Sequence, residues 1–152
     1  MNLREFVRRY SGVAVDFDKA FGAQCVDLIR QYFKDVWGFT RQPEGVIGAE
    51  DFYFKHESRP VQKELCVCTA YDGRTMPPIG SVVIFKAHSG NQYGHIGICV
   101  DAYENCLDVF EQDGVGNAAL LKAGLEQKGA YISRWKYDRL VGWLTAREGV
   151  NG

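Results

Sequence analysis

At 152 residues, of which 46% are hydrophobic and 24% charged, the chain has the size and composition of one globular domain. Its net charge is −1 and its basic residues are scattered, which argues against a nucleic-acid-binding protein. No apolar run approaches the roughly 18 residues of a membrane-spanning helix, and the N-terminal segment lacks the pattern of a signal peptide. We therefore expect no nucleic acid as a partner, no membrane insertion and no export signal.

Apolar residues at helical spacing predict two helices in the first quarter of the chain. They indicate a short helix over residues 2–9 and a longer one over residues 25–37, which Gly38 ends. A weaker helical pattern lies near residues 50–56. The segment that joins the first two helices is expected to be a loop.

After residue 80 the apolar period changes to two, which predicts strands rather than helices. The predicted strands cover residues 81–85, 94–101, 106–112, 131–135 and 140–144. Helices followed by strands of this kind are typical of the α+β class. We predict a single domain over residues 1–146, with N-terminal helices packed on a C-terminal antiparallel sheet, and a short tail over residues 147–152.

Cys25 begins the most regular of the predicted helices. Its thiol would meet the unpaired N–H groups and the positive end of the helix dipole, a setting in which thiols ionise more readily. This position favours Cys25 as a nucleophile, although it also suits a buried cysteine that only starts the apolar face of the helix. Five cysteines without an export signal favour free thiols over disulfides. We assign no role to the others, which are Cys66, Cys68, Cys99 and Cys106.

A candidate base, His95, lies on the predicted strand in "YGHIGICVD". It shares a face of that strand with Gly97, while alternate apolar residues take the other face, which is expected to be the core. Because Gly97 has no side chain, the helix of Cys25 could approach closely enough for the imidazole to reach the sulfur. His56 and His88 have no such setting and are expected in surface loops.

The next strand, in "CLDVFEQDG", supplies two candidate acids. If His95 lies opposite Glu111 or Asp113 in a hairpin, the acid and the imidazole point to the same face of the sheet. A carboxylate there can orient the imidazole, which completes the nucleophile, base and acid of thiol hydrolysis. The alternatives are a solvated Glu111 and a plain turn at Asp113 and Gly114.

These motifs resemble those of the CHAP family, the cysteine- and histidine-dependent amidohydrolases and peptidases, and especially its phage lysin branch. The similar segments are "FGAQCVDL", "PPIGSVVIF", "YGHIGICVD", "VFEQD" and "LVGWL", which follow in the family's order and span essentially the whole chain. The resemblance implies a papain-like α+β fold. It also implies cleavage of peptidoglycan, either at the amide between muramic acid and the stem peptide or at a peptide bond within the stem or cross-bridge.

Position by position, the resemblance makes Cys25 the nucleophile, His95 the base and Glu111 the orienting acid. Asp113 stands where the family often has asparagine, so its role stays open as a fourth candidate catalytic residue. We further expect a monomer that is made in the host cytoplasm and acts on the cell wall after release or as part of a virion. Two other functions remain open: a papain-like amidase on a small amide conjugate, and a catalytically silent module of a cell-wall-binding protein or phage tail.

Three aspartates surround the candidate nucleophile in "DFDKAFGAQCVD". Counted from Asp16, the residues Asp18, Ala20, Gly22 and Asp27 stand at the offsets from which a calcium loop presents its oxygen ligands. The absence of glycine at the sixth position and of glutamate at the twelfth departs from an EF-hand and leaves a capped acidic loop as the alternative. Calcium-binding lysins of this branch have a similar aspartate pattern. We expect calcium to neutralise the carboxylates and fix the loop that delivers the thiol.

Overall fold

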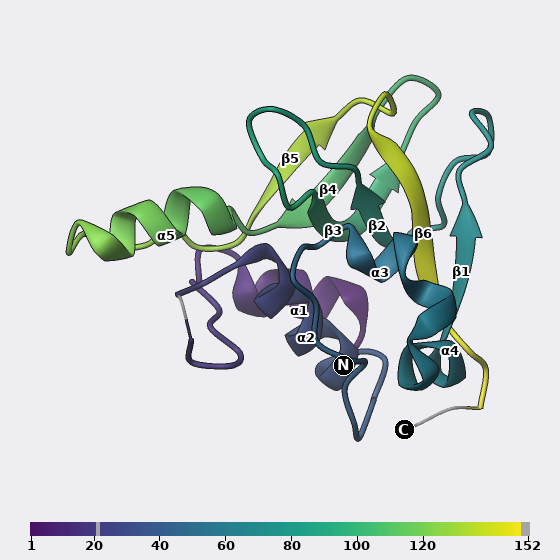
Figure 1. Cartoon of the computed structure of the whole chain (residues 1–152), viewed down its shortest axis with the longest axis horizontal. Helices are drawn as coiled ribbons and strands as arrows, with labels where there is room; N and C mark the ends of the chain where they lie inside the picture. The colour runs from purple at the N-terminus through teal and green to yellow at the C-terminus, as the bar shows by residue number, and fades with distance from the viewer. Residues whose placement is uncertain (21, 150–152) are drawn as a thin grey trace.

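The computed structural model describes residues 1–20 and 22–149 and shows the predicted α+β fold (Figure 1). The helices are α1 (Leu3–Tyr10), α2 (Cys25–Asp35), α3 (Asp51–Phe54), η1 (His56–Ser58, a 3₁₀ turn), α4 (Pro60–Leu65) and α5 (Gly114–Lys122). The strands are β1 (Cys66–Ala70), β2 (Val82–Phe85), β3 (His95–Ala102), β4 (Leu107–Glu111), β5 (Tyr131–Trp135) and β6 (Leu140–Ala146). No helix in the described part of the chain is long and apolar enough to cross a membrane.

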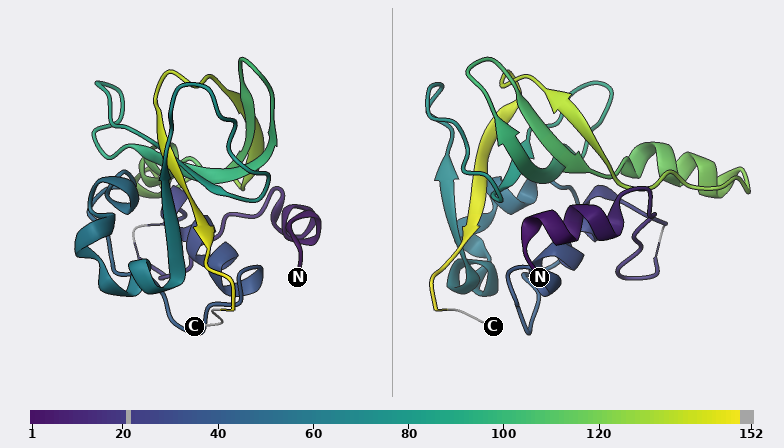
Figure 2. Two further views of the ribbon diagram at one scale, coloured as in Figure 1. Left: turned by 90° about the vertical axis from the view of Figure 1, so that its right-hand side faces the viewer. Right: turned by 180° about the vertical axis from the view of Figure 1, so that it is seen from behind.

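All six strands form one antiparallel sheet in the order β1-β6-β2-β3-β4-β5. Helices α1 and α2 lie together against one side of the sheet, and α5 projects from the body next to the end of β4 (Figures 1 and 2). In this order β3 and β4 are neighbours, so the candidate base and the candidate acids come from adjacent strands.

The main core lies between the helices and the sheet. Phe6 of α1 and Tyr32 of α2 are buried there, with ring centroids 5.1 Å apart in an edge-on arrangement that aromatic pairs favour. Facing them, the sheet contributes Ile84, Ile96, Ile98, Phe110 and Leu144. Because α2 packs on β3, the start of this helix is held close to the start of that strand.

The opposite face of the sheet is also buried, which corrects our expectation that only one face of β3 is core. A second cluster there contains Val83, Phe85, Cys99, Leu107, Val109, Leu140 and Trp143, with Trp135 and Tyr137 packed against it. His95 and Glu111 are therefore not on an open surface but at the edge of this second cluster.

The sequence did not predict β1, α4 or α5, which the structure shows in addition to the expected helices and strands.

A second correction concerns His56, which is buried in η1 rather than lying in a surface loop. Its Nδ1 lies 2.7 Å from Nε2 of the buried Gln62. His88 is exposed, as expected.

At the C-terminus, β6 ends at Ala146, the last residue of the predicted domain. Arg147 still contacts α4, because its backbone N–H donates to the carbonyl of Leu65 at 2.9 Å. Of the predicted tail, residues 150–152 lie outside the described part of the chain.

Candidate active site

Cys25 is the first residue of α2 and is partly exposed. The helix is fixed at this point by Asp27, whose Oδ2 accepts the backbone N–H of Gln24 at 2.9 Å. The N–H of Asp27 donates to the carbonyl of Gln24 at 3.1 Å, whereas those of Cys25 and Val26, at the very start of the helix, have no acceptor one turn before them and can bind an anion. Cys25 and His95 line the same cavity, of about 680 Å³. The structure thus brings together the two residues predicted as nucleophile and base.

His95 is the first residue of β3, and its side chain is buried. Its Nε2 lies 3.1 Å from Oε1 of Glu111, an ion pair when the imidazole is protonated. Burial by itself lowers the pKa of His95, but interactions with Cys25 and Glu111 more than offset this, and the pKa is raised to about 10. The imidazole therefore favours the protonated form that a thiolate partner needs.

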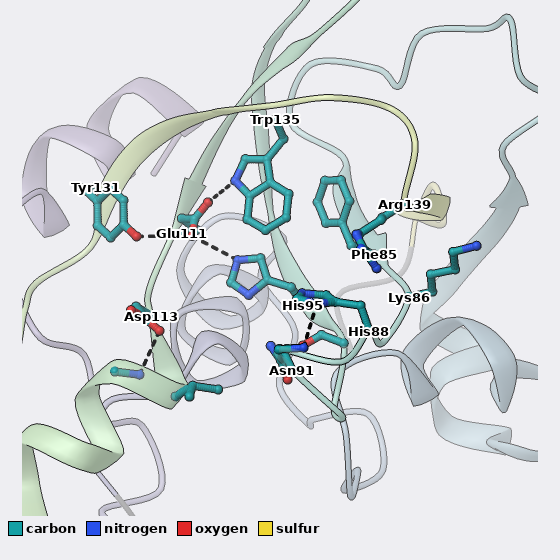
Figure 3. Close-up of a pocket in the computed structure, with 14 residues that line it drawn as sticks. Phe85, Lys86, His88, Asn91, His95, Glu111, Asp113, Tyr131, Trp135 and Arg139 are labelled. Carbon is teal, nitrogen blue, oxygen red and sulfur yellow. Dashed lines mark hydrogen bonds and ion pairs between the residues drawn. The ribbon is translucent and has the colours of Figure 1, made fainter.

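Glu111 is the last residue of β4 and is buried under three side chains from β5. Tyr131, Ser133 and Trp135 alternate along β5 and so point to the face on which Glu111 lies. Ser133 Oγ donates to Oε2 of Glu111. Trp135 Nε1 donates to the same oxygen, and the Tyr131 hydroxyl donates to Oε1 at 3.5 Å (Figure 3). Burial raises the pKa of Glu111, but His95, Ser133 and Trp135 outweigh it, so the pKa is lowered and the carboxylate stays ionised.

The indole of Trp135 also covers the imidazole. The two rings are nearly parallel, with an interplanar angle of 8° and centroids 4.9 Å apart. Phe85 stacks on Trp135 in turn, with centroids 4.6 Å apart. This stack holds the plane of the His95 ring and excludes water from one side of it. Sequence analysis missed Trp135 and Ser133. The available signal was their period-two spacing with Tyr131, which places all three on one face of β5.

Gly97 makes room for a neighbour, as expected, but the neighbour is β4 and not the helix of Cys25. A Cβ at Gly97 would lie 2.2 Å from Cγ1 of Val109 and 3.5 Å from Cβ of Glu111. The register that pairs Ile98 with Phe110 continues to place Glu111 opposite Gly97, so the carboxylate reaches His95 along the diagonal. Helix α2 instead packs on the other face of β3.

Asp113 follows β4 and is the N-cap of α5. Its Oδ1 accepts the backbone N–H of Gly116 at 2.9 Å, the bond that a capping aspartate makes. Within the described residues, no hydrogen bond or ion pair joins Asp113 to His95, although both line the same cavities. The structure gives Asp113 a capping contact and brings Glu111, not Asp113, to the imidazole.

Asp16, Asp18 and Asp27 come together beside the start of α2. Each offers a carboxylate oxygen within 4.8 Å of the others, and they form the one such group of potential metal ligands in the described part of the chain. Oδ1 of Asp16 is buried without a hydrogen-bond partner. Burial and the charges of Asp18 and Asp16 raise the pKa of Asp27 to about 6. A dense set of hard oxygen ligands with uncompensated charge suits a calcium ion.

The two predicted backbone ligands lie in the same loop. The N–H of Ala20 donates to Oδ1 of Asp18 at 2.9 Å, and Gly22 has a positive φ of 78°, which a residue with a side chain rarely adopts. These features curl the loop around the aspartates. Whether the carbonyl oxygens of Ala20 and Gly22 bind an ion stays a prediction.

Buried amides that sequence analysis did not single out anchor this loop. The side chain of Gln112 pairs with both backbone groups of Val15, at 2.8 and 2.7 Å, and also donates to the carbonyl of Gln24 at 2.8 Å. Asn117 of α5 donates to the carbonyl of Ala23 at 2.9 Å. The loop is thus fastened at the residues directly before Cys25.

Fold and site together define a papain-like α+β domain with a cysteine at a helix N-terminus and a histidine and glutamate on adjacent strands. The chain belongs to the CHAP family: the model of the CHAP domain matches residues 14–113, which confirms the resemblance seen in the sequence. This match contains Cys25, His95 and Glu111.

Solved structures share the fold at low sequence identity. The crystal structure of the wild-type endolysin LysIME-EF1 is 18% identical with a TM-score of 0.62, covering 95% of this chain and 64% of that chain. Ly7917 is 18% identical with a TM-score of 0.59, and 0.61 in its structure with the hydrolyzing product of MDP; each covers 93% of this chain and 60% of that chain. This chain therefore spans less than two thirds of the length of these structures. No curated protein matches the sequence.

Proposed function

We propose that the chain is a peptidoglycan hydrolase that cleaves an amide or peptide bond of the bacterial cell wall with Cys25 as its nucleophile. The observation that carries the proposal is the buried His95, which interacts with Cys25 and with an ionised Glu111 at the edge of a cavity. Membership of the CHAP family and the fold shared with an endolysin support a cell-wall substrate.

In this mechanism Cys25 attacks the carbonyl carbon as a thiolate, and the first-turn N–H groups of α2 stabilise the oxyanion. His95 then protonates the leaving amine, and water, activated by the same imidazole, releases the acyl group from the sulfur. Glu111 holds the ring in the required tautomer and stabilises its positive charge. Trp135 keeps the ring plane fixed through both steps.

We also propose that Asp16, Asp18 and Asp27 bind calcium, together with the backbone oxygens of Ala20 and Gly22. The convergence of the three carboxylates and the unpartnered Asp16 oxygen support this assignment. Bound calcium would supply positive charge beside the start of α2, which otherwise faces three carboxylates. The ion would fix the loop and leave the chemistry to Cys25 and His95.

The decisive test is mass spectrometry of fragments that the protein releases from purified peptidoglycan in the presence of calcium. We expect new free amino groups with the wild type, none with Cys25→Ala, and a loss of at least 10²-fold with His95→Ala. Cys106→Ala is the matched control, because this free thiol is also partly exposed but precedes β4, at the opposite end of that strand from Glu111. The fragment masses would distinguish an amidase from an endopeptidase.

Equal release by Cys25→Ala and wild type would refute the thiol mechanism. If several wall types release nothing from the folded, calcium-loaded wild type, the wall-hydrolase proposal is wrong, and an amidase on small conjugates or a silent module becomes the better interpretation.

A further inference from the structure

A second cavity, of about 430 Å³, adjoins the first at His95 and does not include Cys25. Both cavities include His95, but only the larger one includes Cys25, and only the smaller one includes Glu111 and Trp135. Under the proposed function, on which this inference rests, the acyl part of the substrate is bonded to Cys25 and the leaving nitrogen takes its proton from His95. The smaller cavity is therefore the place for the leaving fragment.

Arg139 gives this smaller cavity a positive charge. It lies in the connection from β5 to β6 and is partly buried, and Figure 3 shows its guanidinium directed inward beside Phe85. Within the described residues the guanidinium makes no hydrogen bond or ion pair. By contrast Arg30, also partly buried, donates to backbone carbonyls at 2.9 and 3.1 Å. A partly buried guanidinium without a partner pays a desolvation cost that a bound anion would offset, so Arg139 is a candidate to bind one.

The acids of the cavity do not neutralise Arg139. Glu111 is engaged by His95 and by the donors of β5, and Asp113 caps α5 across the cavity. A second cation stands on the side of Arg139: Lys86 donates its backbone N–H to the carbonyl of Arg139 at 3.0 Å, and its side chain lies at the rim, pointing outward in Figure 3. The cavity is therefore positive at the Arg139 end.

We propose that Arg139 forms a subsite for a free carboxylate on the leaving peptide fragment. The planar guanidinium matches a carboxylate with two parallel hydrogen bonds, and a neutral carboxamide in the same place loses the charge-assisted part of that interaction. The protein should consequently prefer walls whose leaving peptides carry free carboxylates over walls in which those groups are amidated.

The experiment uses purified peptidoglycan in two forms, one mock-treated and one whose carboxylates are converted to carboxamides with carbodiimide and ammonium chloride. For the wild type we expect the KM for amine release to be about tenfold higher on the amidated wall, with kcat little changed. Arg139→Gln should have the raised KM on both walls, and Arg139→Lys should recover part of the preference. Lys136→Gln, which removes a nearby exposed charge outside the cavity, should behave as the wild type.

Equal KM values of the wild type on the two walls would overturn the subsite while leaving the hydrolase proposal intact. A folded Arg139→Gln variant that keeps the full preference for the unamidated wall would also overturn the subsite. So would a Lys136→Gln variant that loses this preference as much as Arg139→Gln does, since that result indicates general attraction to an anionic wall. If Arg139→Gln does not fold, as judged by circular dichroism, Arg139→Lys tests the subsite: it keeps the charge but not the two parallel hydrogen bonds, and should lose part of the preference. Release of amines from neither wall by the wild type would instead refute the proposed function.

Discussion

His95 experiences two opposing influences, and their balance sets its protonation state. Burial disfavours the imidazolium, whereas Cys25 and Glu111 favour it, and the second influence is the stronger because the pKa is raised. Glu111 can exert this effect because Ser133 and Trp135 keep it ionised although it is buried. The positive charge on the base thus depends on donors two strands away from His95.

Replacing Glu111 by Gln should move the alkaline limit of activity to lower pH. The change preserves size but removes a negative charge that raises the pKa of His95, so burial is less opposed and this pKa falls. Since catalysis requires a protonated His95, activity should be lost as pH rises through the lowered pKa. We expect kcat to drop by about 10- to 100-fold at neutral pH, and a profile of kcat/KM against pH measures the shift.

Glu104→Gln is the control for that measurement, because Glu104 is exposed in the turn between β3 and β4. A pH profile of Glu111→Gln that coincides with the wild-type profile would contradict the role we give to Glu111.

At the same scale, the sequence pointed to the candidate residues that a local sequence pattern marks, and it missed those that only strand pairing brings to the site. Cys25 was marked by the start of a helical pattern, and His95 and Glu111 by two strands joined through a short turn. The contact of Trp135 with His95 depends on the pairing of β4 with β5, which are separated by α5. No periodicity within either strand specifies that pairing.

At the scale of elements, the end of β4 links Glu111, the proposed orienting acid, to the aspartate loop. Glu111 faces His95, while the next residue, Gln112, is fully buried and binds the backbone of Val15 and Gln24. One short segment therefore holds both Glu111, which contacts His95, and the loop that precedes Cys25. A shift of either would change the distance between Cys25 and His95.

Replacing Gln112 by Ala should loosen that loop. The substitution leaves the buried backbone N–H and carbonyl of Val15 unpaired, and each such group costs about 1–3 kcal/mol. The carbonyl of Gln24 loses one of its two donors and keeps the N–H of Asp27. We expect the free energy of unfolding to fall by about 3 kcal/mol in chemical denaturation. Hydrogen exchange should also become faster at residues 15–24.

Gln92→Ala, at an exposed position, should change the stability by less than about 0.5 kcal/mol. Unchanged exchange at residues 15–24 in Gln112→Ala would show that other contacts, such as those of Asn117, are sufficient to hold the loop.

The strands and helices that the sequence missed have weak local patterns. Helix α5 begins with Gly114 and Gly116 and buries only the polar Asn117, so it shows no apolar face. Strand β1 follows α4 without an intervening turn residue and is mostly exposed along its length. Both are formed by tertiary contacts: β1 pairs with β6, and Asn117 binds the aspartate loop.

For the whole molecule, the site lies where the helical layer, the sheet and the aspartate loop meet. The connection from α1 to α2 contains the aspartate loop and is hydrogen-bonded to Gln112 and Asn117, which follow β4. Contacts that order this loop therefore hold both the start of α2 and the end of β4 in place. Three carboxylates that face one another oppose this ordering unless a cation joins them.

Calcium should therefore stabilise the entire domain. An ion at 100 times its Kd adds about 2.7 kcal/mol to the free energy of unfolding, which for a chain of this size raises Tm by roughly 5–10 °C. Calorimetry of metal-stripped protein with and without calcium measures the shift, with magnesium as the comparison ion. Absence of both calcium binding and any change in Tm would refute the calcium site.

Asp27→Asn should raise Tm above that of the wild type in the metal-free protein and lower it below that of the wild type when calcium is present. The raised pKa of Asp27, about 6, means that its ionisation costs stability as pH rises from about 4 through 6. At pH 7.5 without calcium, asparagine removes that cost and can still accept the N–H of Gln24, so Tm should exceed that of the wild type. With calcium the wild type should have the higher Tm, because only the wild type gains the ion.

Asp138→Asn, at an exposed position, is the control and should follow the wild type in both conditions. If calcium raises the Tm of Asp27→Asn as much as that of the wild type, Asp27 is not a ligand.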